Sequence, residues 1–202
     1  MTYIGLFFLV VLALYGWDSF VMAPLRLLVV VFHEGGHALM TWLTGGRVVE
    51  IALDVRGGGH TLSEGGMPLL ILNAGYLGSL ASGLALLRAA KGPARAACGA
   101  VGALLLATLA WMPISAGLLY TAAAGLGFCA LAVRASPEVC RWILRGIGVF
   151  SVLYALVDVR LDAGAGDAAI LAARTGVPSL VWTGLWLVTG AASVWVIRRR
   201  IV

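Results

Sequence analysis

The sequence predicts an all-α polytopic membrane protein with six to seven transmembrane helices and a short β-hairpin after the second helix. Of the 202 residues, 61% are hydrophobic and only 11% are charged, and the mean hydropathy is +1.01. A soluble domain carries about 25% charged residues. A helix needs about 20 apolar residues to cross the hydrocarbon core, so the chain has room for six or seven spans and for little else. We therefore expect residues 1–202 to form a single membrane-embedded domain.

Proline, glycine and charged residues divide the chain into seven apolar segments. Ser136, Pro137 and Glu138 form a typical helix start, which places the beginning of the sixth span. Gly45-Gly46 predicts the end of the second. A short helix is expected at about 168–175. The spans themselves are expected at about 3–22, 25–43, 69–87, 94–112, 114–134, 137–158 and 178–197.

The charged residues indicate a membrane environment rather than nucleic-acid binding. The net charge of +5 comes from Arg and Lys residues that collect at the ends of the predicted spans, as expected beside anionic lipids. Cys98, Cys129 and Cys140 are isolated in apolar stretches and lack the spacing of zinc ligands. We therefore predict a multi-pass protein of the cell membrane, with the lipid bilayer as a partner and no nucleic-acid partner.

Residues 47–56 alternate between apolar and charged positions, which is the period of a β-strand. Val49, Ile51 and Leu53 fall on one side of the predicted strand. Three glycines follow as a turn, and residues 60–63 are placed to return as a second strand. The edge of such a hairpin can pair with an extended peptide, which makes the three apolar residues candidate substrate contacts. The alternative interpretation is an ordinary surface loop.

The most informative feature is a His-Glu-x-x-His motif, His33-Glu34-Gly35-Gly36-His37, inside the second predicted span. On a helix, the two imidazoles lie on the same face and can reach one zinc ion. Glu34 is then placed to handle the proton of an activated water. Ionisable side chains are costly within a lipid-buried helix, so they indicate a functional site. We expect His33 and His37 to bind Zn²⁺ and Glu34 to be catalytic.

A catalytic zinc usually has three protein ligands, and the motif supplies two. Asp158 is the favoured third ligand, because it ends the sixth span in an apolar context where an unpaired carboxylate would be costly. Asp162, one turn further if the helix continues, and Asp167 are alternatives, although Asp167 resembles the N-cap of the short helix. His60 and Glu64 are weaker candidates, since both fit an ordinary loop next to glycines.

Asn73 is a polar residue inside the third predicted span, in a stretch rich in glycine. It is placed to hydrogen-bond a neighbouring helix. The alternative role is to donate to the oxyanion of a tetrahedral intermediate, which makes Asn73 a candidate substrate-binding residue. The glycines that follow it would let another helix approach closely.

The motif, the Gly-Gly break after it, the hairpin and the glycine-rich span resemble the site-2 protease family of intramembrane zinc metalloproteases. The closest similarity is to its compact branch, which lacks a PDZ domain. The stretch from Tyr154 to Trp186 resembles the C-terminal portion of that branch. It contains Asp158, Gly166-Asp167-Ala168 and Thr175-Gly176-Val177-Pro178. The resemblance implies His33 and His37 as zinc ligands, Glu34 as the general base and a distant Asp as the third ligand. In many members that Asp precedes a Gly, and this chain has no Asp-Gly pair.

The resemblance implies a protease that hydrolyses a peptide bond in or near a transmembrane segment of a membrane-protein substrate. The alternative is a non-catalytic metal-binding membrane scaffold or transporter component, which the missing Asp-Gly pair favours and the intact Glu34 disfavours. Composition excludes a water-soluble zinc peptidase. The positive-inside rule places the hairpin outside the cell, whereas the resemblance implies a hairpin that faces the cytosol. No oligomeric state follows from the sequence.

Overall fold

The computed structural model describes residues 19–54, 57–159 and 166–200, and the side chains up to residue 195. Most of the described chain is helical, with one two-stranded antiparallel sheet. The elements follow one another in the order α2 (Ala23–Leu43), β1 (Arg47–Asp54), β2 (Gly58–Glu64), α3 (Pro68–Ala89), α4 (Ala94–Thr108), η1 (Leu109–Trp111), α5 (Ala116–Arg134), α6 (Pro137–Val157), α7 (Asp167–Thr175) and α8 (Ser179–Arg200).

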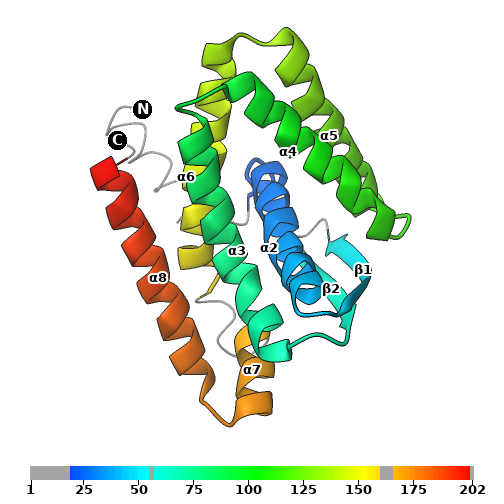
Figure 1. Cartoon of the computed structure of the whole chain (residues 1–202), viewed down its shortest axis with the longest axis vertical. Coiled ribbons are helices and arrows are strands. Elements are labelled where there is room, and N and C mark those ends of the chain that lie inside the picture. Colours follow the sequence, from blue (N-terminus) through cyan, green and yellow to red (C-terminus); the bar gives the residue numbers. More distant parts are fainter. Residues whose placement is uncertain (1–18, 55–56, 160–165, 201–202) are drawn as a thin grey trace.

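Helix α2 lies in the middle of the molecule, packed against α3 and α6 (Figure 1). Consecutive residues Val29, Val30 and Val31 are all buried, so the middle of this helix is covered on every side. Helices α4 and α5 form a separate antiparallel pair on one side, and α8 packs on the other side against α3 and α6. The hairpin and α7 lie together at the end of the bundle where α2 finishes.

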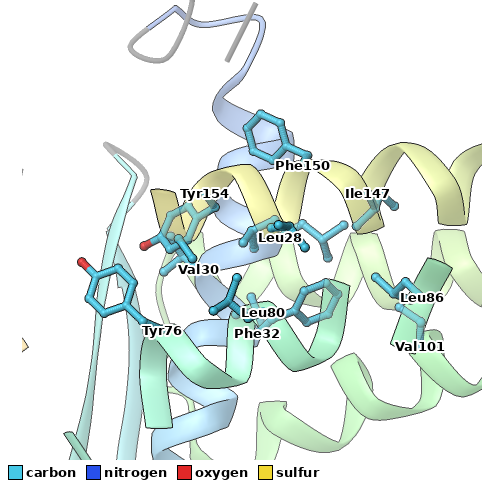
Figure 2. Close-up of a cluster of buried hydrophobic side chains, with 14 of the residues drawn as sticks. Leu28, Val30, Phe32, Tyr76, Leu80, Leu86, Val101, Ile147, Phe150 and Tyr154 are labelled. Atoms are coloured by element: carbon cyan, nitrogen blue, oxygen red, sulfur yellow. The ribbon is translucent and has the colours of Figure 1, made fainter. Parts of the chain in front are cut away.

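The hydrophobic core lies between α2, α3 and α6. Figure 2 shows Leu28 and Phe32 of α2 among apolar side chains of the neighbouring helices. Tyr76 of α3 and Tyr154 of α6 lie at the end of this cluster that is nearer to the strands (Figure 2). The core therefore passes from purely apolar packing into a pair of tyrosine side chains, next to the histidines of α2.

The protein is a multi-pass membrane protein, as the composition predicts. In the described part of the chain, four helices are long and apolar enough to cross a bilayer, at Pro68–Ala89, Ala94–Trp111, Ala116–Arg134 and Pro137–Val157. The apolar part of α8 that was searched is shorter, at Ser179–Trp195. The predicted span at 3–22 lies outside the described residues except for its last four positions. The other predicted spans each coincide with a helix to within a few residues.

The helix starts follow the local signals in the sequence. Ser136 is the N-cap of α6, where its hydroxyl accepts a hydrogen bond from the Val139 amide, and Pro137 is the first helical residue. Ser115 caps α5 in the same way by accepting from the Leu118 amide. The predicted start of the sixth span is confirmed. It could be predicted because these signals act within one helical turn.

The hairpin is confirmed, but its inward face differs from the expected one. Val49 is opposite no residue of β2, because the register shifts between Val48 and Glu50 as in a β-bulge. The bulge turns Val49 outward and brings Val48 inward, in line with the buried Ile51 and Leu53. Strict alternation holds only where each residue has one partner, so the extra residue reverses the pattern at the start of the strand.

Candidate metal centre

His33 and His37 lie one turn apart on α2, and the packing brings α7 against the Nε2 atoms of both rings. The Nε2 atoms of His33 and His37 each lie 3.2 Å from the Oδ2 atom of Asp167. One ligand atom from each of the three residues lies within 4.8 Å of the other two. Both histidines are buried, and the Asp167 side chain is 15% exposed. Residues far apart in the sequence therefore form one compact group of potential metal ligands.

The geometry and chemistry of this group fit zinc. Tetrahedral zinc, with bonds of about 2.0–2.1 Å, separates its ligand atoms by about 3.3 Å, close to the contacts of Asp167. His37 Nδ1 donates a hydrogen bond of 2.7 Å to the carbonyl oxygen of Ile71. A neutral His37 then directs the lone pair of Nε2 at the carboxylate. Two facing lone pairs repel each other, and a divalent cation between them removes that repulsion.

Gly75 of α3 provides the space beside the two imidazoles. A Cβ at this position would lie 2.4 Å from His33 Nε2 and 2.5 Å from His37 Nε2. Real Cβ contacts are never this short, so any side chain at residue 75 would displace the ring nitrogens. The glycine expected from sequence to allow close helix packing thus also keeps the ligand atoms accessible.

Asp167 is the first residue of α7, and the structure corrects the N-cap role expected for it. Gly166 takes the cap position with a φ of 151°, which favours glycine, and the Asp167 carboxylate contacts the two imidazoles. Burial by itself raises the pKa of the Asp167 carboxyl. Its contacts with His33 and His37 have the larger combined effect and hold this pKa well below its usual range. The carboxylate is thus held in the ionised form that metal ligands require.

Asp158, the favoured third ligand in the sequence analysis, is not part of this group. It follows the last residue of α6, and Tyr76 Oη donates to its Oδ2 over 3.1 Å. Burial raises the pKa of Asp158, against the lowering effect of the nearby His33. The structure brings Asp167 rather than Asp158 to the imidazoles. Asp162 lies outside the described residues.

Glu34 faces a cavity of about 610 Å³ that is lined by α2, β2, α3, α6 and α7. The Glu34 side chain is buried, and Thr61 of β2 donates a hydrogen bond of 2.8 Å to its Oε2. The cavity holds the three potential ligands together with Tyr76 and Tyr154. A carboxylate, a metal-binding group and enough space for an extended peptide segment are therefore in one place.

Asn73 lies on a different side of α3 from the cavity. Its Oδ1 accepts a hydrogen bond of 2.9 Å from Trp186 Nε1 on α8, and its Nδ2 donates to the Leu69 carbonyl oxygen over 2.8 Å. Asn73 is not among the residues that line the cavity. Asn73 therefore forms a hydrogen bond with a neighbouring helix, which is the first of its two expected roles. The oxyanion role has no support from this geometry.

The candidate substrate contacts on β1 do not reach the cavity either. Ile51 and Leu53 are buried, and Leu53 lies directly against Gly117 of α5. Val49 is exposed at the bulge. The strand that lines the cavity is β2, from residue 58 to residue 63. The strand expected to line the site was β1, and the structure places β2 there instead.

The two weaker ligand candidates form surface ion pairs. His60 lines the cavity but is exposed, and its Nε2 lies 3.4 Å from Glu50 Oε1. Glu64 pairs with Arg47 at 2.6 Å across the two strands. Neither side chain belongs to the group formed around Asp167.

Sequence reasoning missed Thr61 and Tyr76 and assigned Asp167 a lesser role. Thr61 lies two positions from both Gly59 and Ser63 in the sequence. The two-residue period of a strand therefore predicts that these three residues share one face of the second strand. No comparable signal existed for Tyr76, whose contact with His33 depends on how α3 packs against α2. Asp167 was an alternative third ligand, placed below Asp158 because its position before Ala168 also fits a helix cap.

Comparison with known families agrees with this site. No curated protein and no solved structure matches the chain. A family model described as Peptidase M50B-like matches residues 6–197, which span the motif helix, the hairpin and Asp167. The M50 peptidases are zinc metallopeptidases, in agreement with the donor set of two imidazoles and one carboxylate. The chain therefore belongs to the Peptidase M50B-like family, within the site-2 protease family of membrane metallopeptidases.

Proposed function

We propose that this protein is an intramembrane zinc metalloprotease that hydrolyses a peptide bond in or near a transmembrane segment of a membrane-protein substrate. The observation that carries the proposal is the convergence of His33, His37 and Asp167 beside Glu34 in a buried cavity. A protein that only binds metal needs the three ligands but gains nothing from a buried carboxylate next to them. The position of Glu34 thus favours the protease over a scaffold or transporter component.

In this proposal, His33, His37 and Asp167 hold the zinc, and Asp167 replaces Asp158 as the third ligand. The chemistry that bound zinc supplies is Lewis acidity, which lowers the pKa of a water toward about 7 and polarises a carbonyl. Glu34 takes the proton of the attacking water and passes it to the leaving amine. Gly75 keeps the ligand nitrogens uncovered, and His37 is held in orientation by the Ile71 carbonyl.

The substrate helix must unwind before cleavage, because its carbonyl groups are engaged in its own hydrogen bonds. Strand β2 runs along the cavity and is paired with β1 on one edge. An unwound substrate segment can add to a strand edge through main-chain hydrogen bonds, largely independent of its sequence. We therefore infer that β2, rather than β1, holds the substrate extended.

The proposal is tested with purified protein in liposomes together with a single-span membrane protein as test substrate. Zinc content and cleavage are measured for the native chain and for Glu34→Gln, Asp167→Asn and Asp158→Asn. Glu34→Gln should keep its zinc and lose cleavage by at least about 10²-fold, the usual contribution of a general base. Asp167→Asn should lose zinc and cleavage together. Asp158→Asn should keep its zinc.

Each substitution also has an outcome that contradicts the proposal. A native protein that stays metal-free in excess zinc is no metalloprotease. Cleavage that survives Glu34→Gln removes Glu34 from the chemistry. Loss of zinc from Asp158→Asn, with zinc retained by Asp167→Asn, would return Asp158 to the position of third ligand.

A further inference from the structure

We propose that Thr61 is a positioning residue, which anchors one oxygen of the Glu34 carboxylate so that the other is directed to the reacting water. This inference rests on the proposed protease function, since it assigns a role relative to the general base. It concerns the hairpin, which thereby contributes to the catalytic machinery as well as to the wall of the cavity. Three alternate residues of β2, Gly59, Thr61 and Ser63, contact α2.

The first observation is the hydrogen bonding of Thr61. Its Oγ1 lies 2.8 Å from Glu34 Oε2 and 3.1 Å from the Glu34 carbonyl oxygen. A hydroxyl has a single proton, and a bond to an ionised acceptor is about twice as strong as one to a neutral acceptor. The carboxylate is therefore the preferred acceptor. Because Glu34 is buried, a lost hydrogen bond is not replaced easily by bulk water.

The second observation concerns the other oxygen of the same carboxylate. In the described part of the chain, Glu34 Oε1 accepts no hydrogen bond. It lies beside Gly59, where a Cβ would be only 2.8 Å away. Gly59 and Thr61 are two positions apart on β2 and so face the same way. The strand thus presents a donor to Oε2 and, at Gly59, a residue without a side chain to Oε1, which leaves Oε1 to accept a proton.

The third observation is that the strand itself is fixed in register. Ser63, the next residue on this face, forms a hydrogen bond of 2.7 Å with Thr41 of α2. Thr41 lies two helical turns beyond Glu34 on the same stripe of the helix. On its other side β2 is paired with β1, with Thr61 opposite Ile51. The donor is therefore held at a defined height along α2, which is what orientation of a catalytic group requires.

The test compares three single substitutions in the liposome assay. Thr61→Val keeps the shape of the side chain and removes the donor, and Thr61→Ser restores the donor without the methyl group. Thr121→Val is the matched control, since it makes the same exchange at a buried threonine of α5, whose hydroxyl donates to the Gly117 carbonyl oxygen and which does not line the cavity. We measure kcat, KM, zinc content and thermal stability for each. Thr61→Ala serves as a second donor-free variant if Thr61→Val does not fold.

The donor-free variants should lose about 10- to 100-fold in kcat, the range seen when the hydrogen-bond partners of active-site groups are removed, with KM and zinc content unchanged. Thr61→Ser should recover most of the native kcat. Thr121→Val should reduce stability but keep kcat. A native kcat in the donor-free variants overturns the inference. So does an equal loss in Thr121→Val, because the loss of any buried threonine hydroxyl then lowers activity through stability. A native chain that cleaves nothing instead contradicts the proposed function.

Discussion

The central helices α2, α3 and α6 and the outer pair α4 and α5 are built from similarly apolar sequences but serve different purposes. Within their most apolar windows, α3 and α6 are 44% and 56% buried, whereas α4 and α5 are 28% and 22% buried. The residues that line the cavity come from α2, β2, α3, α6, α7 and the adjoining loops, and none of those in the described part comes from α4 or α5. The outer pair instead exposes large apolar side chains, as a lipid-facing surface does.

This difference shows that hydrophobicity identifies a membrane helix but not its neighbours. A lipid tail and a buried leucine present the same apolar surface, so both kinds of helix have the same composition. The distinguishing feature is whether a small residue contacts the candidate site. Gly75 lies against the ring nitrogens of the two histidines, whereas Gly102 of α4 lies against α5, at Cys129 and Gly125. Gly127 of α5 has open space around its Cβ position.

The largest effect is expected from Gly75→Ala, which adds a methyl group among the ligand nitrogens. Its Cβ would lie within 2.5 Å of the Nε2 atoms of both histidines, so the imidazoles must move away from Asp167. We expect loss of bound zinc and of cleavage, measured by metal analysis and by the liposome assay. Gly127→Ala is the matched control in the outer pair and should leave both unchanged. Native zinc content in Gly75→Ala would show that the site lies elsewhere.

A smaller effect is expected from Gly36→Ala, which separates α2 from α3. Its Cβ would lie 2.2 Å from the Ala74 carbonyl oxygen and 3.3 Å from the Cα of Gly78, so backbone must shift. Overpacking of this kind costs about 1–3 kcal/mol, and the thermal stability in detergent should fall together with activity.

Gly35→Ala provides the control within the same motif, because nothing lies within 4 Å of its Cβ position. Alanine is the better helix former, by about 1 kcal/mol, so this variant should be at least as stable as the native chain. If both variants lose activity equally, the glycines act through the helix backbone and not through the contact with α3.

The smallest effect on function is expected from Gly102→Ala, in the contact between α4 and α5. Its Cβ would lie 2.7 Å from Cys129 Sγ and 2.8 Å from the Gly125 carbonyl oxygen, so the pair must separate slightly. Thermal stability should fall by about 1–3 kcal/mol, with the zinc content of the folded protein unchanged. Gly99→Ala meets only Ala132 Cβ at 3.4 Å and should have no effect. Zinc loss in Gly102→Ala would end the distinction between centre and periphery.

Much of the fold could be predicted because the signals are local. Pro137 and Ser136 specify a helix start within a single turn, and His33 and His37 share a face because the helix repeats every 3.6 residues. The bulge at Val49 could not be predicted, since an extra residue in one strand is defined only against its partner strand.

The sequence by itself determined that this is a membrane protein with a zinc motif in an apolar helix, because composition and helical period act over a few residues. Only the tertiary structure decided which carboxylate lies beside the two imidazoles and which threonine donates a hydrogen bond to Glu34. Asp167 lies 134 positions from His33 along the chain, and its contact depends on the packing of α7 at the end of the bundle. Asp158 is also an aspartate next to apolar segments, but the end of α6 brings it to Tyr76 instead.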